Sequence, residues 1–158
     1  MPIMGTYRKI YPRFKFLVLI NGFLSAAFQK ATGMKVTFGE LKYYEGGMVV
    51  PYKEPALMEF EDCTLERGVS KETDFYQWVL DVTDIMKKPP GGTGKTSPNF
   101  FRDLLVRQLD RDDKPAIDWN LYWGFPKEWT PGEFDNTSND PNIETLVVGY
   151  HHHRRVTL

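Results

Sequence analysis

Alternating apolar positions predict a β-strand near the start of the chain. The residues that recur at every second position are Phe14, Phe16, Val18 and Ile20. Some residues between them are also apolar, which suits a strand that is partly buried on both faces. Asn21-Gly22 follows, and both residues tolerate a positive φ, so we expect a hairpin turn that returns the chain through residues 23–28.

The same segment has some features of a secretory signal. Basic residues precede the apolar run over residues 16–20, and Ser25-Ala26-Ala27 follows at about the distance of a cleavage site. The run ends early, which favours the strand, and a cleaved signal stays the alternative. No stretch reaches the roughly 18 continuous apolar residues of a membrane-spanning helix, so the sequence predicts no membrane anchor.

A second extended segment, residues 34–44, leads into a stretch rich in glycine and proline. Pro51 and Pro55 disfavour a regular central strand over residues 46–57, while the apolar side chains there need a cover. We therefore predict that residues 46–57 are an assembly arm that contributes little to the core of its own subunit. The expected oligomer-interface residues are Gly46, Gly47, Met48, Val49, Val50 and Tyr52. The next strand is expected over residues 58–69.

Residues 73–86 have the period of an amphipathic α-helix. Ser70 or Thr73 can cap its N-terminus, and Pro89-Pro90 end it. Apolar side chains recur at the spacing of one helix face, which predicts that this face packs on a sheet. The residues expected to enter the core are Phe75, Trp78, Val82 and Ile85.

The remainder of the chain returns to strand patterning. Strands are predicted over residues 101–109, 118–124 and 143–150, the last running on towards Val156. The predicted order is β-β-β-β-α-β-β-β. It indicates a β-dominated α+β fold, an antiparallel β-sandwich or barrel with one flanking α-helix, in a single domain over residues 1–158.

Composition narrows the class of protein. The chain has 158 residues, 41% of them hydrophobic and 26% charged, which is the balance of one globular domain and not of a disordered chain. Its net charge of -1 gives no electrostatic reason to bind nucleic acid or an anionic membrane. Cys63 is the only cysteine, so neither an intrachain disulfide nor a cysteine-based zinc cluster is expected.

The segment Pro89-Pro90-Gly91-Gly92-Thr93-Gly94-Lys95-Thr96 matches a phosphate-binding loop only in part. The pattern requires a glycine where Pro89 stands, and such a loop follows a strand and opens a helix. This segment instead follows the predicted helix. Residues 87–98 are therefore predicted to be a Gly/Pro-rich surface loop that binds no nucleotide.

No other residues form a convincing catalytic or metal site. Of His151-His152-His153, only the first and third would share one face of a strand, and no carboxylate is near them in sequence. A polar strand end or an interface patch is favoured over a metal site. Cys63 lies in a strand pattern and is expected to be a buried small residue. The sequence predicts a protein that is not an enzyme and that needs no cofactor or metal.

Six segments follow one another in the order of a known family. The first three are Phe28-Gln29-Lys30-Ala31-Thr32-Gly33-Met34, Tyr43-Tyr44-Glu45-Gly46-Gly47 and Phe60-Glu61-Asp62-Cys63-Thr64-Leu65-Glu66-Arg67-Gly68-Val69. The others are Phe75-Tyr76-Gln77-Trp78, Trp119-Asn120-Leu121-Tyr122-Trp123-Gly124-Phe125-Pro126 and Asp135-Asn136-Thr137-Ser138-Asn139 with Ile143-Glu144-Thr145-Leu146. Together they resemble the inner tail-tube proteins of contractile phage tails and contractile injection systems. Two departures are the long 87–98 loop and Cys63, which stands where a branched aliphatic residue is usual.

The resemblance implies a structural protein that assembles as a hexameric ring. Rings would stack into a hollow tube that conducts DNA or effector cargo inside a contractile sheath, with baseplate and tail-terminator proteins as further partners. The protein would then be part of a virion tail or an injection particle. A baseplate tube-initiator ring of the same fold is the alternative. From a different class, a secreted β-sandwich ligand-binding module would use an aromatic platform of Trp119, Tyr122, Trp123 and Trp129.

Overall fold

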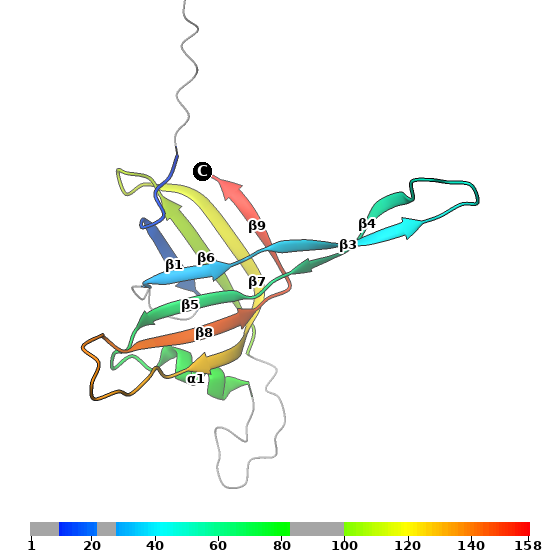
Figure 1. The fold of residues 1–158 in the computed structure, drawn as a ribbon. Helices are drawn as coiled ribbons and strands as arrows, with labels where there is room; N and C mark the ends of the chain where they lie inside the picture. The colour runs from blue at the N-terminus through cyan, green and yellow to red at the C-terminus, as the bar shows by residue number, and fades with distance from the viewer. Residues whose placement is uncertain (1–9, 22–27, 83–99) are drawn as a thin grey trace, which may run out of the picture.

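A computed structural model describes residues 10–21, 28–82 and 100–158 of the chain. Within these residues the chain forms nine strands and one helix (Figure 1). In chain order the elements are β1 (Phe16–Ile20), β2 (Lys30–Gly33), β3 (Val36–Tyr43), β4 (Tyr52–Phe60), β5 (Cys63–Gly68), α1 (Asp74–Asp81), β6 (Arg102–Leu109), β7 (Pro115–Thr130), β8 (Ile143–Gly149) and β9 (His152–Thr157). The predicted β-dominated class with one helix is confirmed.

The strands make one antiparallel sheet and a separate two-stranded ribbon. The sheet has the order β1-β6-β7-β8-β5-β2 with β9 also on β7, and the ribbon is β3-β4. Gly149 of β8 pairs with Phe125 of β7. His152 of β9 pairs with Tyr122, three residues earlier on β7, so β8 and β9 run in succession along one edge of β7. This confirms the expected continuation of the last strand beyond Tyr150.

The core lies between the two parts of the sheet that β7 joins. Figure 1 shows β1, β6 and β9 on one side of the fold and β5 and β8 on the other, with α1 beside the second group. Their inward side chains form a single apolar cluster. Its fully buried members include Val18, Leu65, Leu104, Leu121, Leu146 and Val148. Helix α1 adds Phe75 and Trp78, and Trp78 Nε1 donates a hydrogen bond of 2.6 Å to the Phe100 carbonyl.

The predicted helix is confirmed over Asp74–Asp81 and begins directly after Thr73, but without the expected side-chain cap. Phe75 and Trp78 are buried as expected, Val82 follows the last helical residue and is half-buried, and Ile85 lies outside the described residues. Thr73 makes no side-chain cap, because its backbone (φ -110°, ψ 13°) is not in the extended conformation that aims a capping oxygen at the first turn. No helix among the described residues is long and apolar enough to span a membrane.

β1 pairs with β6, and the next described strand, β2, pairs with β5. This long-range pairing places Val18 and Ile20 against the core. The return strand of the hairpin expected at Asn21-Gly22 falls on residues 22–27. Those residues, like the loop expected over 87–98, lie outside the described part of the chain.

The strand expected over residues 58–69 is in fact the end of β4 and the whole of β5. The break comes where the ribbon leaves the sheet: Gly33 (φ 97°) and Met34 (φ 61°) both adopt left-handed backbone between β2 and β3. The Glu61 N–H donates to the Lys35 carbonyl at 2.8 Å and fixes this crossing point. β7 is also longer than the expected 118–124, because its second half turns to pair with β8.

Candidate assembly surface

The β3–β4 ribbon, with its connecting turn, projects from the sheet as an arm (Figure 1). The two strands pair from Val36–Phe60 at the base to Tyr43–Tyr52 near the tip. Pro55 lies next to an irregularity in the register, where a residue without a backbone N–H is tolerated. The arm is thus a regular ribbon with only one neighbour for each strand.

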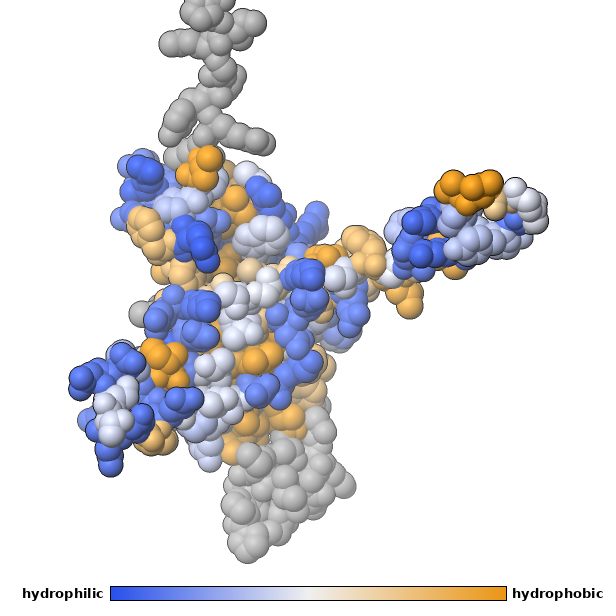
Figure 2. Space-filling model, viewed as in Figure 1, coloured by the Kyte–Doolittle hydropathy of each residue, from blue (hydrophilic) through white to orange (hydrophobic). Residues whose placement is uncertain are grey.

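Large apolar side chains are exposed along the whole arm. Val49 at the tip is 96% exposed and Leu57 is 87% exposed. The other exposed members are Phe38, Leu41, Tyr43, Tyr44, Met48, Val50, Tyr52 and Met58. Figure 2 shows apolar surface at the tip and again near the base of the arm. An isolated two-stranded ribbon is at best marginally stable in water, so the arm needs a cover that the described part of its own subunit does not supply.

The predicted arm, residues 46–57, is one part of this longer structure. A turn closes the tip, where the Met48 N–H donates to the Glu45 carbonyl at 3.1 Å and Gly47 has φ 86°. From Tyr52 onward the segment is strand β4 of a two-stranded ribbon and not a central strand of the sheet, as its prolines indicate. Proline disfavours a central strand, whereas β4 has a free edge. The interface role of the segment stays a prediction.

Charged side chains on the arm differ in their pairing. Glu40 lies 3.5 Å from Lys53 and 4.0 Å from Lys42. Glu45 and Glu54 are closer to the tip and form no ion pair with another described residue. The tip therefore carries unpaired negative charge beside exposed apolar side chains.

Three strands of the sheet have one unpaired edge in the described chain. β1 pairs only with β6, β2 only with β5, and β9 only with β7. Such edges offer backbone N–H and C=O groups to another chain. β9 carries His152, His153, Arg154 and Arg155, and basic side chains on an edge discourage unspecific pairing. The subunit thus has several edges at which a specific partner strand can be added.

A groove of about 540 Å³ lies between β1 and β2, the two end strands of the sheet. We call it the seam groove. Its apolar lining is Phe14, Phe16, Phe28, Met34, Val106 and Trp119. Arg13 and Lys30 also line it, and neither forms an ion pair with a described residue. The seam groove is therefore an apolar depression with two free cations at its side.

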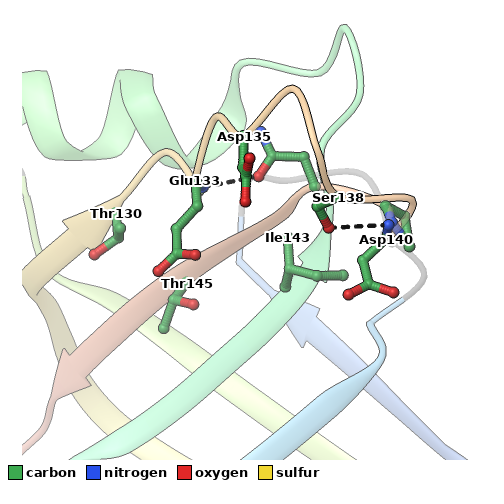
Figure 3. A pocket seen from close by; sticks show the side chains of 10 residues that line it. Thr130, Glu133, Asp135, Ser138, Asp140, Ile143 and Thr145 are labelled. Carbon is green, nitrogen blue, oxygen red and sulfur yellow. Dashed lines mark hydrogen bonds between the residues drawn. The ribbon is translucent and has the colours of Figure 1, made fainter.

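A second pocket, of about 340 Å³, lies in the loop that joins β7 to β8 (Figure 3). Glu133, Asp135 and Asp140 line it. Asp135 accepts hydrogen bonds from the backbone and the hydroxyl of Thr137, which lower the pKa of its carboxyl. Among the described residues, no group of three or more His, Cys, Asp or Glu side chains is placed to hold a metal ion. The pocket is a depression between the polar side chains of this loop.

The consecutive histidines lie in different surroundings, as alternation on a strand predicts. His153 Nε2 lies 3.0 Å from the Met34 carbonyl, and its ring meets Phe60 edge to face at 4.9 Å between centroids. His152 stacks on Tyr122 at 4.8 Å. The three rings therefore do not converge on one ligand sphere.

The aromatic residues of β7 do not form one platform. Trp119 faces the seam groove, whereas Trp123 is 55% exposed and its ring lies 5.6 Å from that of Phe101. Trp129 packs on Tyr76 of α1 at 5.4 Å. Ten residues of extended strand, roughly 33 Å, separate Trp119 from Trp129. The ligand platform expected for a secreted binding module is not formed by these side chains.

Comparison of the sequence with models of known protein families gives a match. Residues 12–154 match the family model of the T4-like virus tail tube protein gp19. The chain belongs to this family. The resemblance inferred from six short segments is confirmed, and the protein is a structural subunit of a tail tube. Among curated protein sequences, none matches the chain.

Several solved structures have a similar fold. This tail-tube protein matches the tube-terminating cap of the anti-feeding prophage with a TM-score of 0.81 and 20% identity, over 100% of both chains. A chain of the extended PVC sheath-tube complex matches with a TM-score of 0.79 and 18% identity, over 94% of this chain and 93% of that chain. Hcp1 from Flavobacterium johnsoniae matches at 0.55 and 12%, over 91% and 96%. At these identities the likeness concerns the fold alone.

Strand β5 of this tail-tube protein holds a buried charge that the sequence did not reveal. Its alternation turns Cys63, Leu65 and Arg67 to the interior. Arg67 is 2% exposed, Nε donates to Glu144 of β8, and its guanidinium lies 3.9 Å from the centroid of Phe75. The pair ties β5, β8 and α1 together. Cys63 is buried as predicted, and burial raises the pKa of its thiol to about 12.

Proposed function

We propose that this tail-tube protein assembles as hexameric rings, which stack into the hollow inner tube of a contractile phage tail or injection system. The family supports a tube subunit, and the observation that carries the assembly mode is the uncovered arm. Its ten large exposed apolar side chains have no cover within the described subunit. A neighbouring copy supplies that cover, and a closed ring satisfies every copy at once.

Unpaired strand edges provide the second joint of the ring. In one part of the sheet the order is β1-β6-β7-β9, and both β1 and β9 have a free edge. The two edge strands have five and six residues, so their lengths match. Pairing β9 of one subunit with β1 of the next continues the sheet around the ring and leaves neither edge exposed.

The tube has a structural role and no catalytic one in this proposal. A contractile sheath surrounds it, and baseplate and terminator proteins bind its ends, as the solved complexes of similar fold suggest. The lumen conducts DNA or effector cargo. The protein then works as part of a phage tail or an injection particle and needs no cofactor.

Deletion of residues 48–54 tests the assembly role of the arm. We expect a soluble, folded subunit that no longer forms tubes, because these side chains lie outside the core cluster. The matched control replaces the exposed loop residues 136–139 with Gly/Ser and should still assemble. Hydrogen exchange adds a second measurement: arm amides should exchange fast in free subunits and slowly in the polymer. Equal protection in both states would mean that the arm is covered by its own subunit.

A terminal or initiator ring of the same fold is the second candidate. The match to a tube-terminating cap supports a terminal ring. The match to a chain of the sheath-tube complex supports a polymerising tube subunit equally well. Electron microscopy of the purified protein separates the two, since a tube subunit gives stacks of rings and a terminal protein gives isolated rings.

A further inference from the structure

The seam groove combines an apolar floor with a basic side. Phe16, Phe28 and Trp119 line it while remaining only partly buried. Arg13 and Lys30 supply two positive charges that no described side chain neutralises. An occupant that fits both features has adjacent apolar side chains and at least one carboxylate.

One wall of the seam groove, β2, has a free edge that the proposed ring leaves unpaired. β2 pairs only with β5, whereas the free edge of β1 is taken by β9 of the next subunit in the proposed ring. An extended segment entering the groove can hydrogen-bond to the edge of β2 while its side chains reach the apolar floor. The backbone thus favours an extended chain over a helix or a small molecule.

The arm tip has the matching chemistry. Met48, Val49 and Val50 are three consecutive exposed apolar residues in the turn that closes the arm. Glu45 and Glu54 lie on either side of them and form no ion pair with described residues. The tip therefore offers apolar side chains between two free carboxylates, which is the complement of the seam groove.

The arm cannot fill the groove of its own subunit. β3 has eight residues, so it carries the tip roughly 26 Å away from its base. Figure 1 shows the arm pointing away from the sheet, with β1 at the opposite side of the fold. The tip that enters a seam groove must come from another copy.

We propose that the seam groove receives the arm tip, residues 45–54, of a second copy of this chain. Met48, Val49 and Val50 lie over the aromatic floor, and Glu45 or Glu54 pairs with Lys30 or Arg13. This docking rests on the proposed assembly role of the arm and specifies the surface that the arm binds. It couples the arm of each subunit to the sheet of a neighbour.

Disulfide trapping tests the docking directly. Val49→Cys and Gln29→Cys are made in separate chains, and the two variants are mixed, assembled and oxidised; Gln29 lines the groove. Native Cys63 is buried and does not interfere. We expect a disulfide-linked dimer in the mixture, with positions 49 and 29 joined in mass spectrometry. Phe134→Cys is the matched control, because Phe134 is 88% exposed in the β7–β8 loop and does not line the groove, and it should give no dimer with Val49→Cys.

The outcomes separate the docking from the assembly role. Tubes that form without a 49–29 disulfide would overturn the docking and leave the proposed function intact. If wild-type protein forms neither rings nor tubes, the proposed function itself is refuted. An intrachain disulfide between Gly5→Cys and Gln29→Cys would assign the groove to the N-terminal segment of the same chain, and the docking would be wrong.

Charge exchange gives an independent readout. Lys30→Glu should raise the protein concentration at which tubes appear by about tenfold, because it sets two carboxylates against each other. Adding Glu45→Lys should restore most of the loss, and Glu54→Lys should do so if that residue is the partner. Rescue by neither, with the folded subunit intact by circular dichroism, would contradict the proposed pairing.

Discussion

Trp78→Ala is the sharpest test of how α1 packs on the sheet. Trp78 is fully buried, and its indole N–H donates to the Phe100 carbonyl at 2.6 Å. A buried aromatic side chain of this size covers about 200 Å², which at about 25 cal/mol per Å² is worth about 5 kcal/mol, and alanine retains part of it. The substitution should therefore lower the free energy of unfolding by about 3–5 kcal/mol.

Urea denaturation followed by circular dichroism measures this loss, at a protein concentration where light scattering shows free subunits. Trp78→Phe should lose less, because it keeps most of the ring volume and gives up the hydrogen bond to Phe100. Gln77→Ala is the control, since Gln77 is the exposed neighbour on the same helix. If Trp78→Ala and Gln77→Ala unfold at the same urea concentration, the packing of α1 described above is wrong.

Two further substitutions and one labelling experiment test separate parts of the subunit. Glu144→Ala should lower the free energy of unfolding by less than the about 3–5 kcal/mol of an unpaired buried charge, because Arg67 loses its nearest carboxylate but keeps Glu72 at 3.5 Å and Asp74 at 3.9 Å; an unchanged stability would contradict the buried pair. Gly33→Ala should unfold far more readily than Gly46→Ala, since an added Cβ at Gly33 meets the Asp62 carbonyl and Gly46 has open space, whereas equal effects would refute that close approach. Cys63 should resist thiol reagents at pH 8, where a thiol of pKa about 12 is protonated, and react fully in urea; fast labelling of the native protein would show that the site is open.

The helix and two of the strands could be predicted because their buried residues recur at a regular spacing within one short segment. The stripe of Phe75 and Trp78 gave the helix face, and alternation gave β6 and β8 within a residue or two. Residues 46–52 were assigned to assembly because apolar side chains between glycine and proline have no regular place in a subunit core, and that role stays a prediction.

Long-range pairing was not predictable from local patterns. Nothing in residues 14–21 indicates that Val18 and Ile20 are buried by the pairing of β1 with β6, more than 80 residues away. The division of residues 58–69 into two strands depends on the left-handed backbone at Gly33 and Met34. These residues are far in sequence from the break, so the local pattern does not predict it. The seam groove is likewise formed by β1 and β2, the two end strands of the sheet, so no single sequence motif predicts it.

Electron cryomicroscopy of the concentrated, purified protein tests the central claim most directly. If the chain is a tail-tube subunit, wild-type protein should form hollow tubes of stacked six-fold rings, with the arm of each subunit ordered against a neighbour. The deletion of residues 48–54 should remain as folded single subunits under the same conditions. A wild-type protein that stays monomeric at every concentration, with its arm free in solution, would contradict the assembly that the fold and the family support.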